Sequence, residues 1–218
     1  MSVETTDKRM APGRTNDPEG TRRNIIDVAT KEFAQRGLSG ARIDEIAAKT
    51  KCSKRMIYYY FESKEGLYRR VLEAAYSKVR GFEGSLDLDD LPPVKALERL
   101  VRFTFDYHDS NEDFIRLVMI ENIHRAKYLA QSSHIQKLNL KAIDTVSHLL
   151  ERGVREGVFR PGLDPIELHW KISALCFFNV SNRATFSRIF ERDLDSRESL
   201  ASLREGVVEM IVRHVENR

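Results

Sequence analysis

The stretch RIDEIAAKTKCSKRMIYYYF, residues 42–61, has the pattern of two short helices joined by a tight turn. In its first half the apolar residues recur every three to four positions, as on one face of a helix over residues 42–50. Ser53 is a suitable N-cap for a second helix that runs through residue 60. Such a pair predicts a helix-turn-helix, whose second helix must be short and slim to enter a DNA major groove about 12 Å wide.

The side chains of this stretch divide into a supporting set and a projecting set. The residues expected to support the second helix from behind are Ile43, Ile46, Ala47, Cys52 and Ile57. The residues left to project toward DNA are Lys54, Arg55, Met56, Tyr58 and Tyr59. Lysine, arginine and tyrosine suit phosphates and base edges, and methionine suits the methyl group of thymine. A solvated helix face can be equally basic, so the ordered pattern rather than the charge carries this prediction.

The flanking sequence also predicts helices, and none of it shows the alternation of a strand. A helix from about residue 21 has Ile25, Ala29 and Phe33 at intervals of four and ends at Gly37, and Ser63 caps a fourth helix through about residue 80. Further helices are predicted over residues 93–110, 112–125, 133–155, 165–183 and 196–215. The predicted fold class is all-α with about nine helices, a small N-terminal helix-turn-helix domain preceding a larger helical domain.

Composition and charge narrow the class of protein. The 218 residues are 41% hydrophobic and 32% charged, with no apolar run long enough to cross a membrane and no signal-peptide pattern at the start. Two cysteines cannot make a disulfide framework, which favours a reducing compartment and a cytoplasmic location. Residues 1–70 hold 15 Lys or Arg against 10 Asp or Glu, so this end favours a polyanionic partner. Residues 1–20, with proline and glycine among charges, predict a flexible arm.

Residues 21–70 resemble the DNA-binding domain of the TetR family of bacterial transcription regulators. The matching pieces occur in the family's order over about fifty residues. They are the long first helix ending at Phe33 and Gly37, the run IDEIA (43–47), Ser53-Lys54 with Tyr58 and Phe61, and the run SKEGL (63–67). The resemblance implies a DNA-binding domain over residues 21–80, with its helix-turn-helix at about 42–61.

The resemblance also implies roles for single residues. The implied DNA contacts are Arg42, Ser53, Lys54, Arg55, Met56, Tyr58, Tyr59 and Lys64. Arg42 would meet the DNA backbone, Arg55 would read a guanine, and Lys64 would hold a phosphate where the fourth helix begins and its dipole helps. The chain departs from the family pattern at three places. Lys51 stands where glycine is frequent, Tyr60 stands where histidine is frequent, and threonine or serine is frequent near Arg42.

By the same resemblance, residues 82–218 form a ligand-binding and dimerisation domain. Helices 165–183 and 196–215 would pair with their mates in a homodimer, and a small organic effector would bind among the middle helices. The candidate effector contacts are Phe103, Tyr107, Met119, Asn122, Ile123, Trp170 and Phe177. MIENIHRAKYLAQS (119–132) and CFFNVSNRATF (176–186) are similar to parts of TetR regulators of aromatic or nicotinate-type catabolism.

Signatures of catalysis and of metal binding are missing. Glu121 and His124 have the Glu-x-x-His spacing of metal-binding bundles, but a di-iron site needs a second such pair and the sequence has none. Nucleotide-binding loops, zincin motifs, nucleophile elbows and paired CxxC motifs are absent as well. We therefore expect no catalytic residues, no metal and no cofactor.

The expected function is that of a DNA-binding transcriptional regulator. In this interpretation, a repressor dimer leaves a pseudo-palindromic operator when a small organic effector binds its C-terminal domain. Two other classes stay open, a helical protein that binds a partner protein and a helical enzyme that uses the C-terminal pocket. Activation instead of repression also stays open, because nothing in the sequence separates the two.

Overall fold

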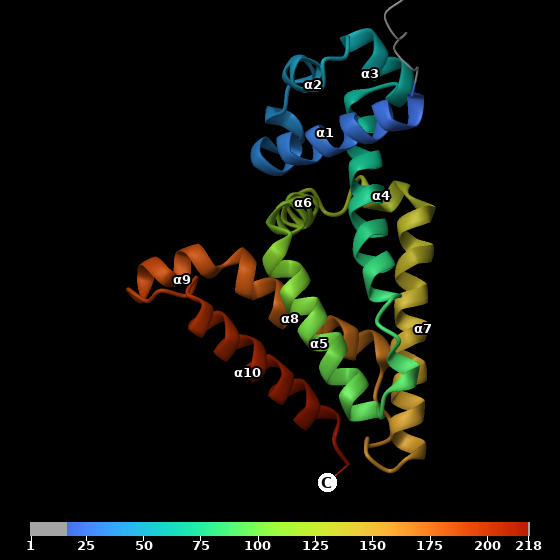
Figure 1. The fold of residues 1–218 in the computed structure, drawn as a ribbon, viewed down its shortest axis with the longest axis vertical. Coiled ribbons are helices and arrows are strands. Elements are labelled where there is room, and N and C mark those ends of the chain that lie inside the picture. The colour runs from blue at the N-terminus through green and yellow to red at the C-terminus, as the bar shows by residue number, and fades with distance from the viewer. Residues whose placement is uncertain (1–16, 218) are drawn as a thin grey trace, which may run out of the picture.

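The computed structural model describes residues 17–217, and this part of the chain folds into ten α-helices with no β-strand (Figure 1). The N-terminal helices are α1 (Pro18–Gly40), α2 (Ile43–Thr50), α3 (Lys54–Phe61) and α4 (Lys64–Glu83). The remaining helices are α5 (Pro93–Ser110), α6 (Glu112–Ile123), α7 (Ser133–Arg155), α8 (Pro165–Ser181), α9 (Arg183–Ile189) and α10 (Arg197–Val215). The all-α prediction is confirmed, with one helix more than the nine expected.

The extra helix is α9, which the sequence pattern did not predict. The helix expected to run through residue 183 ends at Ser181, because the chain turns at Asn182 and a new helix starts at Arg183. The guanidinium of Arg183 forms ion pairs with Asp109 at the end of α5 and with Asp195 ahead of α10. Asp109 is distant from Arg183 in sequence, so no local pattern predicts the break between α8 and α9.

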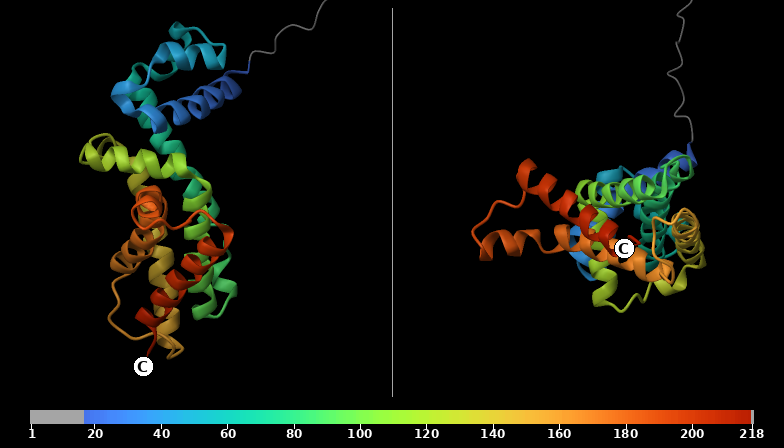
Figure 2. Two further views of the ribbon diagram at one scale, coloured as in Figure 1. Left: turned by 90° about the vertical axis from the view of Figure 1, so that its left-hand side faces the viewer. Right: turned by 90° about the horizontal axis from the view of Figure 1, so that it is seen from below.

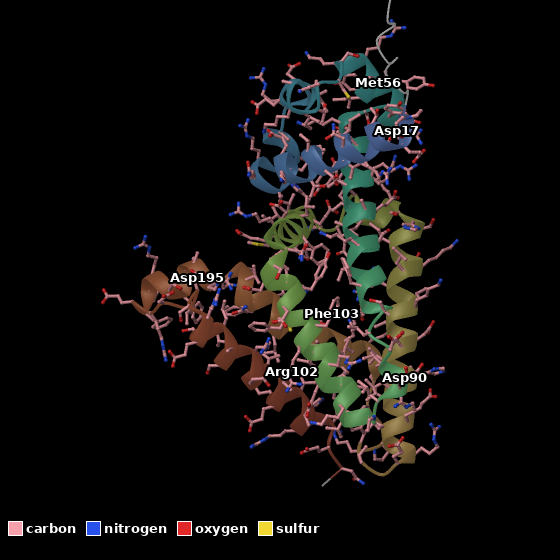
Figure 3. All side chains as sticks on the ribbon, in the orientation of Figure 1. Asp17, Met56, Asp90, Arg102, Phe103 and Asp195 are labelled. Carbon is pink, nitrogen blue, oxygen red and sulfur yellow. The ribbon has the colours of Figure 1, made fainter. Side chains whose placement is uncertain are left out.

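Polar side chains begin several of the helices as expected. Ser53 accepts a hydrogen bond from the backbone N–H of Met56 at 3.2 Å, and Ser63 accepts one from that of Gly66 at 2.9 Å. Asp17, labelled in Figure 3, caps α1 in the same way, so this helix starts at Pro18 rather than near residue 21. The predicted arm over residues 1–20 lies mostly outside the described residues, and its last three residues are the first turn of α1.

Two positive φ angles shape the turns around the helix-turn-helix. Gly37 has φ +66°, which interrupts the helical backbone near the end of α1, where the sequence predicts that the helix stops. Lys51, which follows α2, has φ +55° and ψ +27° in the left-handed region that glycine adopts without steric cost. The family's frequent glycine at this position therefore has a conformational reason, and the lysine is strained.

The N-terminal helices bury one hydrophobic cluster. Phe33 of α1 and Tyr68 of α4 are fully buried and meet edge to face, with ring centroids 5.1 Å apart. The same cluster includes Leu117 of α6 and Ile135 of α7, and α6 packs across α1 below the helix-turn-helix (Figure 1). The core of the DNA-binding helices thus extends into the C-terminal part of the chain.

A second cluster lies among α5, α7, α8 and α10. The ring of Phe159, which follows α7, packs against Gly153. A Cβ at Gly153 would lie only 1.9 Å from this ring. Arg102 of α5, labelled in Figure 3, donates to Glu205 of α10 at 2.8 Å and ties these helices together. Beyond this core, α9 joins the ends of α8 and α10 into a hairpin that projects from the rest of the domain (Figures 1 and 2).

Candidate functional site

Helix α3 presents a polar and aromatic face at the end of the molecule far from the C-terminus (Figure 1). Ile57 and Phe61 point into the core and fix the helix from behind. Arg42, Ser53, Lys54, Arg55, Met56, Tyr58 and Tyr59 are all exposed, Tyr59 to 78%. Met56 is labelled at this end in Figure 3. The seven residues therefore lie together on a surface that a major groove can reach.

Lys64 differs from these seven residues because it is only half-exposed. It occupies the first turn of α4, and its Nζ donates to the backbone carbonyl of Ser39 at 3.4 Å. This position places an ammonium group at a helix N-terminus, where phosphate binding is favourable. The Ser39 contact is long enough to be exchanged for a phosphate contact without rebuilding the helix.

Asp44 on α2 partly neutralises the basic surface. Its carboxylate forms an ion pair with Lys54, and the guanidinium of Arg42 lies 3.9 Å from it. These side chains are exposed, so the pairs are weak and a DNA phosphate can compete for both cations. The sequence reasoning did not single out Asp44 as part of this exposed surface.

Arg22 and Tyr60 extend the surface toward the start of α1. The guanidinium of Arg22 lies over the Tyr60 ring, 5.0 Å from its centroid. Tyr60 also meets Tyr59 edge to face at 5.4 Å between centroids. The tyrosine that stands where the family often has histidine is therefore half-buried and supports Arg22 and Tyr59.

A cavity of about 700 Å³ lies among α4, α5, α6, α7 and α8. This volume is within the range of small-molecule sites in proteins. Of the residues proposed from sequence, four line it: Phe103, Asn122, Trp170 and Phe177. Figure 3 labels Phe103 on α5, in the middle of the lower domain. Trp170 is 70% exposed, so it stands at the edge of the cavity and not in its depth.

The other three proposed contacts lie outside this cavity. The ring of Tyr107 packs between Phe82 and Phe114, with centroids 6.2 and 6.1 Å away, on the side of α5 that faces α4. Met119 and Ile123 are 38% and 75% exposed because they fall on the solvent side of α6. The apolar character of α6 did not reveal which of its faces turns inward.

The polar wall of the cavity was not predicted from the sequence. Arg80 and Glu83 of α4 form a buried ion pair, and Arg80 also donates from Nε and one Nη to Oδ1 of Asn139 on α7, at 3.1 and 2.9 Å. Opposite them stand His108 of α5 and His169 of α8. The sequence does contain one signal for this wall, which is a set of residues three or four positions apart on α4. This spacing puts all of them on one helix face: Tyr76, Val79, Arg80 and Glu83.

Burial keeps both cavity histidines neutral. The pKa of His108 is lowered to about 4, mainly by burial and also by the charge of Arg80, while the Cys176 backbone carbonyl opposes the shift. The pKa of His169 is lowered by burial first and by Arg80 second. Neither imidazole carries a charge at neutral pH.

Glu121 turns away from the cavity. It is buried, and its Oε2 accepts the backbone N–H groups of Tyr128 and Leu129 at 3.1 and 2.9 Å. Its charge also contributes to raising the pKa of Tyr68, after burial. Glu121 therefore anchors the connection after α6 near the DNA-binding helices. Across residues 17–217, no group of three or more His, Cys, Asp or Glu is placed to hold a metal ion.

Comparison with known proteins decides the family. Residues 25–71 match the family model for bacterial regulatory proteins of the tetR family, and residues 93–211 match the tetracyclin repressor-like C-terminal domain. The chain belongs to the TetR family. It is 35% identical over 188 residues to the HTH-type transcriptional repressor NicS of Pseudomonas putida, covering 86% of this chain and 89% of NicS.

Solved structures of TetR-like regulators have the same fold. The putative transcriptional regulator SCO4942 of Streptomyces coelicolor superposes with a TM-score of 0.67 at 25% identity, over 89% of this chain and 98% of that one. FadR of Bacillus subtilis, solved with stearoyl-CoA, gives 0.69 at 18% identity, over 89% of this chain and 99% of that one. This TetR-family chain is a DNA-binding transcriptional regulator of the repressor class, and neither the family nor these relatives are enzymes. Within residues 17–217, no helix is long and apolar enough to span a bilayer.

Proposed function

We propose that this TetR-family regulator binds DNA as a homodimer, with one α3 helix in each of two successive major grooves. The observation that carries this proposal is the common exposure of the α3 face, backed by buried Ile57 and Phe61. The residues assigned to DNA are Arg42, Ser53, Lys54, Arg55, Met56, Tyr58, Tyr59 and Lys64. Two-fold symmetry of the protein requires a pseudo-palindromic site with half-sites about 34 Å apart. Contact with the chromosome also assigns the protein to the cytoplasm.

The proposed dimer face is formed by α8 and α10. Trp170 and Phe178 are exposed along α8, and Leu203 and Met210 are exposed along α10. Large apolar side chains in such stripes favour burial against a second copy. The two-fold operation would bring the same stripes together from both subunits, as an isologous interface requires. Replacing Met210 with glutamate should convert the dimer to monomers in analytical ultracentrifugation, while Leu140→Glu on α7 should leave it dimeric.

The proposed effector site is the cavity beside α4. Lys64 at the DNA end of α4 and Arg80 at its cavity end belong to one continuous helix. An effector that prefers one orientation of this helix would shift the dimer toward a spacing of the α3 helices that no longer fits the operator. DNA affinity would then fall, which is the behaviour of an effector-released repressor.

Two substitutions test the proposed division of roles on the DNA. The operator is first obtained by selecting random-sequence duplexes with the purified protein and reading their symmetry. Arg55→Ala should weaken operator binding by about 1–3 kcal/mol and relax the sequence preference. Lys64→Ala should weaken binding to all sequences and reduce the slope of affinity against salt. Equal losses on operator and random DNA for both variants would refute the assignment.

A further inference from the structure

The polar wall of the cavity carries no net charge. Arg80 and Glu83 neutralise each other, and both are largely buried, with side-chain exposures of 15% and 7%. The two histidines that face them are uncharged for the reason given above. An ionised ligand would therefore enter a mainly apolar cavity without a free countercharge, which is unfavourable where the ligand loses water.

A ligand carboxylate would meet a specific obstacle at Arg80. The guanidinium donates from Nε and one Nη to Asn139 and from the other Nη to Glu83. An incoming carboxylate would lie beside the Glu83 carboxylate or would have to displace it from its buried partner. Either arrangement opposes the binding of an anion, even though an arginine lines the cavity.

His108 supplies the one buried imidazole nitrogen in residues 17–217 that has no hydrogen-bond partner. The residue is 7% exposed, it lines the cavity, and its Nδ1 is buried and unpaired. The Cys176 backbone carbonyl favours an N–H on the ring, as its effect on the pKa of His108 indicates. In a neutral imidazole one nitrogen donates and the other accepts, so the ring can pair with a ligand hydroxyl, which can do both. A buried imidazole nitrogen without a partner is costly, and a ligand that hydrogen-bonds to the ring lowers that cost.

We propose that the cavity binds an uncharged aromatic compound that carries a hydroxyl group, with this hydroxyl hydrogen-bonded to the imidazole of His108. Phe103, Phe114 and Phe177 supply aromatic faces for the ring, and about 700 Å³ accommodates one or two fused rings with substituents. This ligand class rests on the proposal that the cavity is the effector site. It adds two statements to that proposal: the ligand is uncharged, and the His108 imidazole recognises its polar group.

Three probes of similar shape separate charge from hydrogen bonding. They are 2-naphthol, which is a neutral donor at pH 7.5, 2-naphthoate, which is an anion, and 2-methylnaphthalene, which has no polar group. Isothermal titration calorimetry on the full-length protein should show 2-naphthol binding at least tenfold more tightly than either other probe. Tighter binding of 2-naphthoate, or equal binding of 2-naphthol and 2-methylnaphthalene, would overturn the proposal. Failure of all three to bind at millimolar concentration would overturn it as well.

Variants of His108 then test whether its imidazole causes the preference. In His108→Phe, which keeps a flat ring but loses both nitrogens, 2-naphthol and 2-methylnaphthalene should bind equally. In His108→Gln, whose amide can donate and accept, part of the preference for 2-naphthol should return. Thermal unfolding confirms that each variant is folded, and if one is not, the other and the wild-type series still decide. A preference for 2-naphthol that persists in folded His108→Phe would refute the role of the His108 imidazole.

DNA binding is measured separately, so that failures can be assigned. If 2-naphthol binds with the expected preference but operator affinity is unchanged, the ligand class stands and the effector role of the cavity fails. If the operator is bound tightly but no probe binds, the ligand class fails and the DNA-binding role stands.

Discussion

The helix-turn-helix end and the α5–α10 end of this molecule differ in how completely their helices pack. Around α2 and α3 the helices are short, Ser53 caps the start of α3, and Ile57 and Phe61 fill the space behind the exposed face. Around α8 the helices are longer, and they leave a cavity and exposed apolar stripes unfilled. The first region is specified by local sequence. The second depends on contacts between residues far apart in the chain, and on what it binds.

The largest expected effect tests how tightly the first region is packed. A Cβ on Gly66 would lie 2.1 Å from the Phe61 carbonyl oxygen, so Gly66→Ala must shift the junction of α3 and α4. We expect the free energy of unfolding to fall by about 3 kcal/mol, with loss of DNA binding, measured by urea denaturation.

Gly81 provides a matched control on the same helix. A Cβ there would meet nothing within 4 Å, so Gly81→Ala should raise the free energy of unfolding by about 0.5–1 kcal/mol through helix propensity alone. Equal stabilities for the two variants would show that the α3–α4 junction can shift at little cost. The claim that this region is tightly packed would then be wrong.

The second prediction concerns the cavity region and its buried histidine. The pKa of His108 falls from 6.5 to about 4 on folding, so folding favours the neutral ring. As pH falls below 6.5, His108 in the unfolded chain takes up a proton while His108 in the folded protein stays neutral. The stability that this group contributes is therefore lost between pH 6.5 and about 4. Between pH 7.5 and 5 the loss should be about 2 kcal/mol in urea denaturation.

His108→Gln isolates this contribution from that of other groups. The variant should lose about 2 kcal/mol less than the wild type over the same pH range, whatever its stability at pH 7.5. Parallel pH profiles for the two proteins would mean that His108 is not held neutral, which would remove the electrostatic basis for the ligand class.

The third prediction sharpens the account of the DNA-facing surface. Asp44→Asn removes the carboxylate that pairs with Lys54 and approaches Arg42. Operator and random DNA should both bind about 3–10-fold more tightly, with a steeper dependence on salt, because two cations become available to phosphates. Fluorescence anisotropy at several salt concentrations measures both quantities. Asp144→Asn, the same charge change on exposed α7, should leave them unchanged, and if it has the same effect, only net charge matters.

The smallest effect concerns the strained turn of the helix-turn-helix. Lys51→Gly relieves a left-handed backbone and should stabilise the protein by about 0.5 kcal/mol, after the entropy of glycine is subtracted. Ala48→Gly, three residues earlier on exposed α2, should instead destabilise it by about 1 kcal/mol. Chemical denaturation at equilibrium resolves the difference in sign. A loss of stability in both variants would mean that Lys51 bears no strain.

The contrast between the regions also explains what could be predicted from sequence. The caps at Ser53 and Ser63, the stop at Gly37 and the strained Lys51 all follow from residues within four positions. Helix α9 could not be predicted, because Arg183 is held by Asp109, 74 residues away. The polar residues of the cavity wall could not be predicted for the same reason. Arg80 meets Asn139 across 59 residues, so its burial becomes visible only when α4 and α7 pack together.

The hydrophobic cluster under the helix-turn-helix sets an order of events during synthesis. Leu117 and Ile135 belong to the core that Phe33 and Tyr68 begin. The N-terminal helices therefore emerge from the ribosome with part of their apolar surface uncovered, and they complete their core only when the start of α7 has followed. A nascent chain that stalls in the α4–α5 connection would expose that surface, and such chains should be the ones that chaperones and proteases capture.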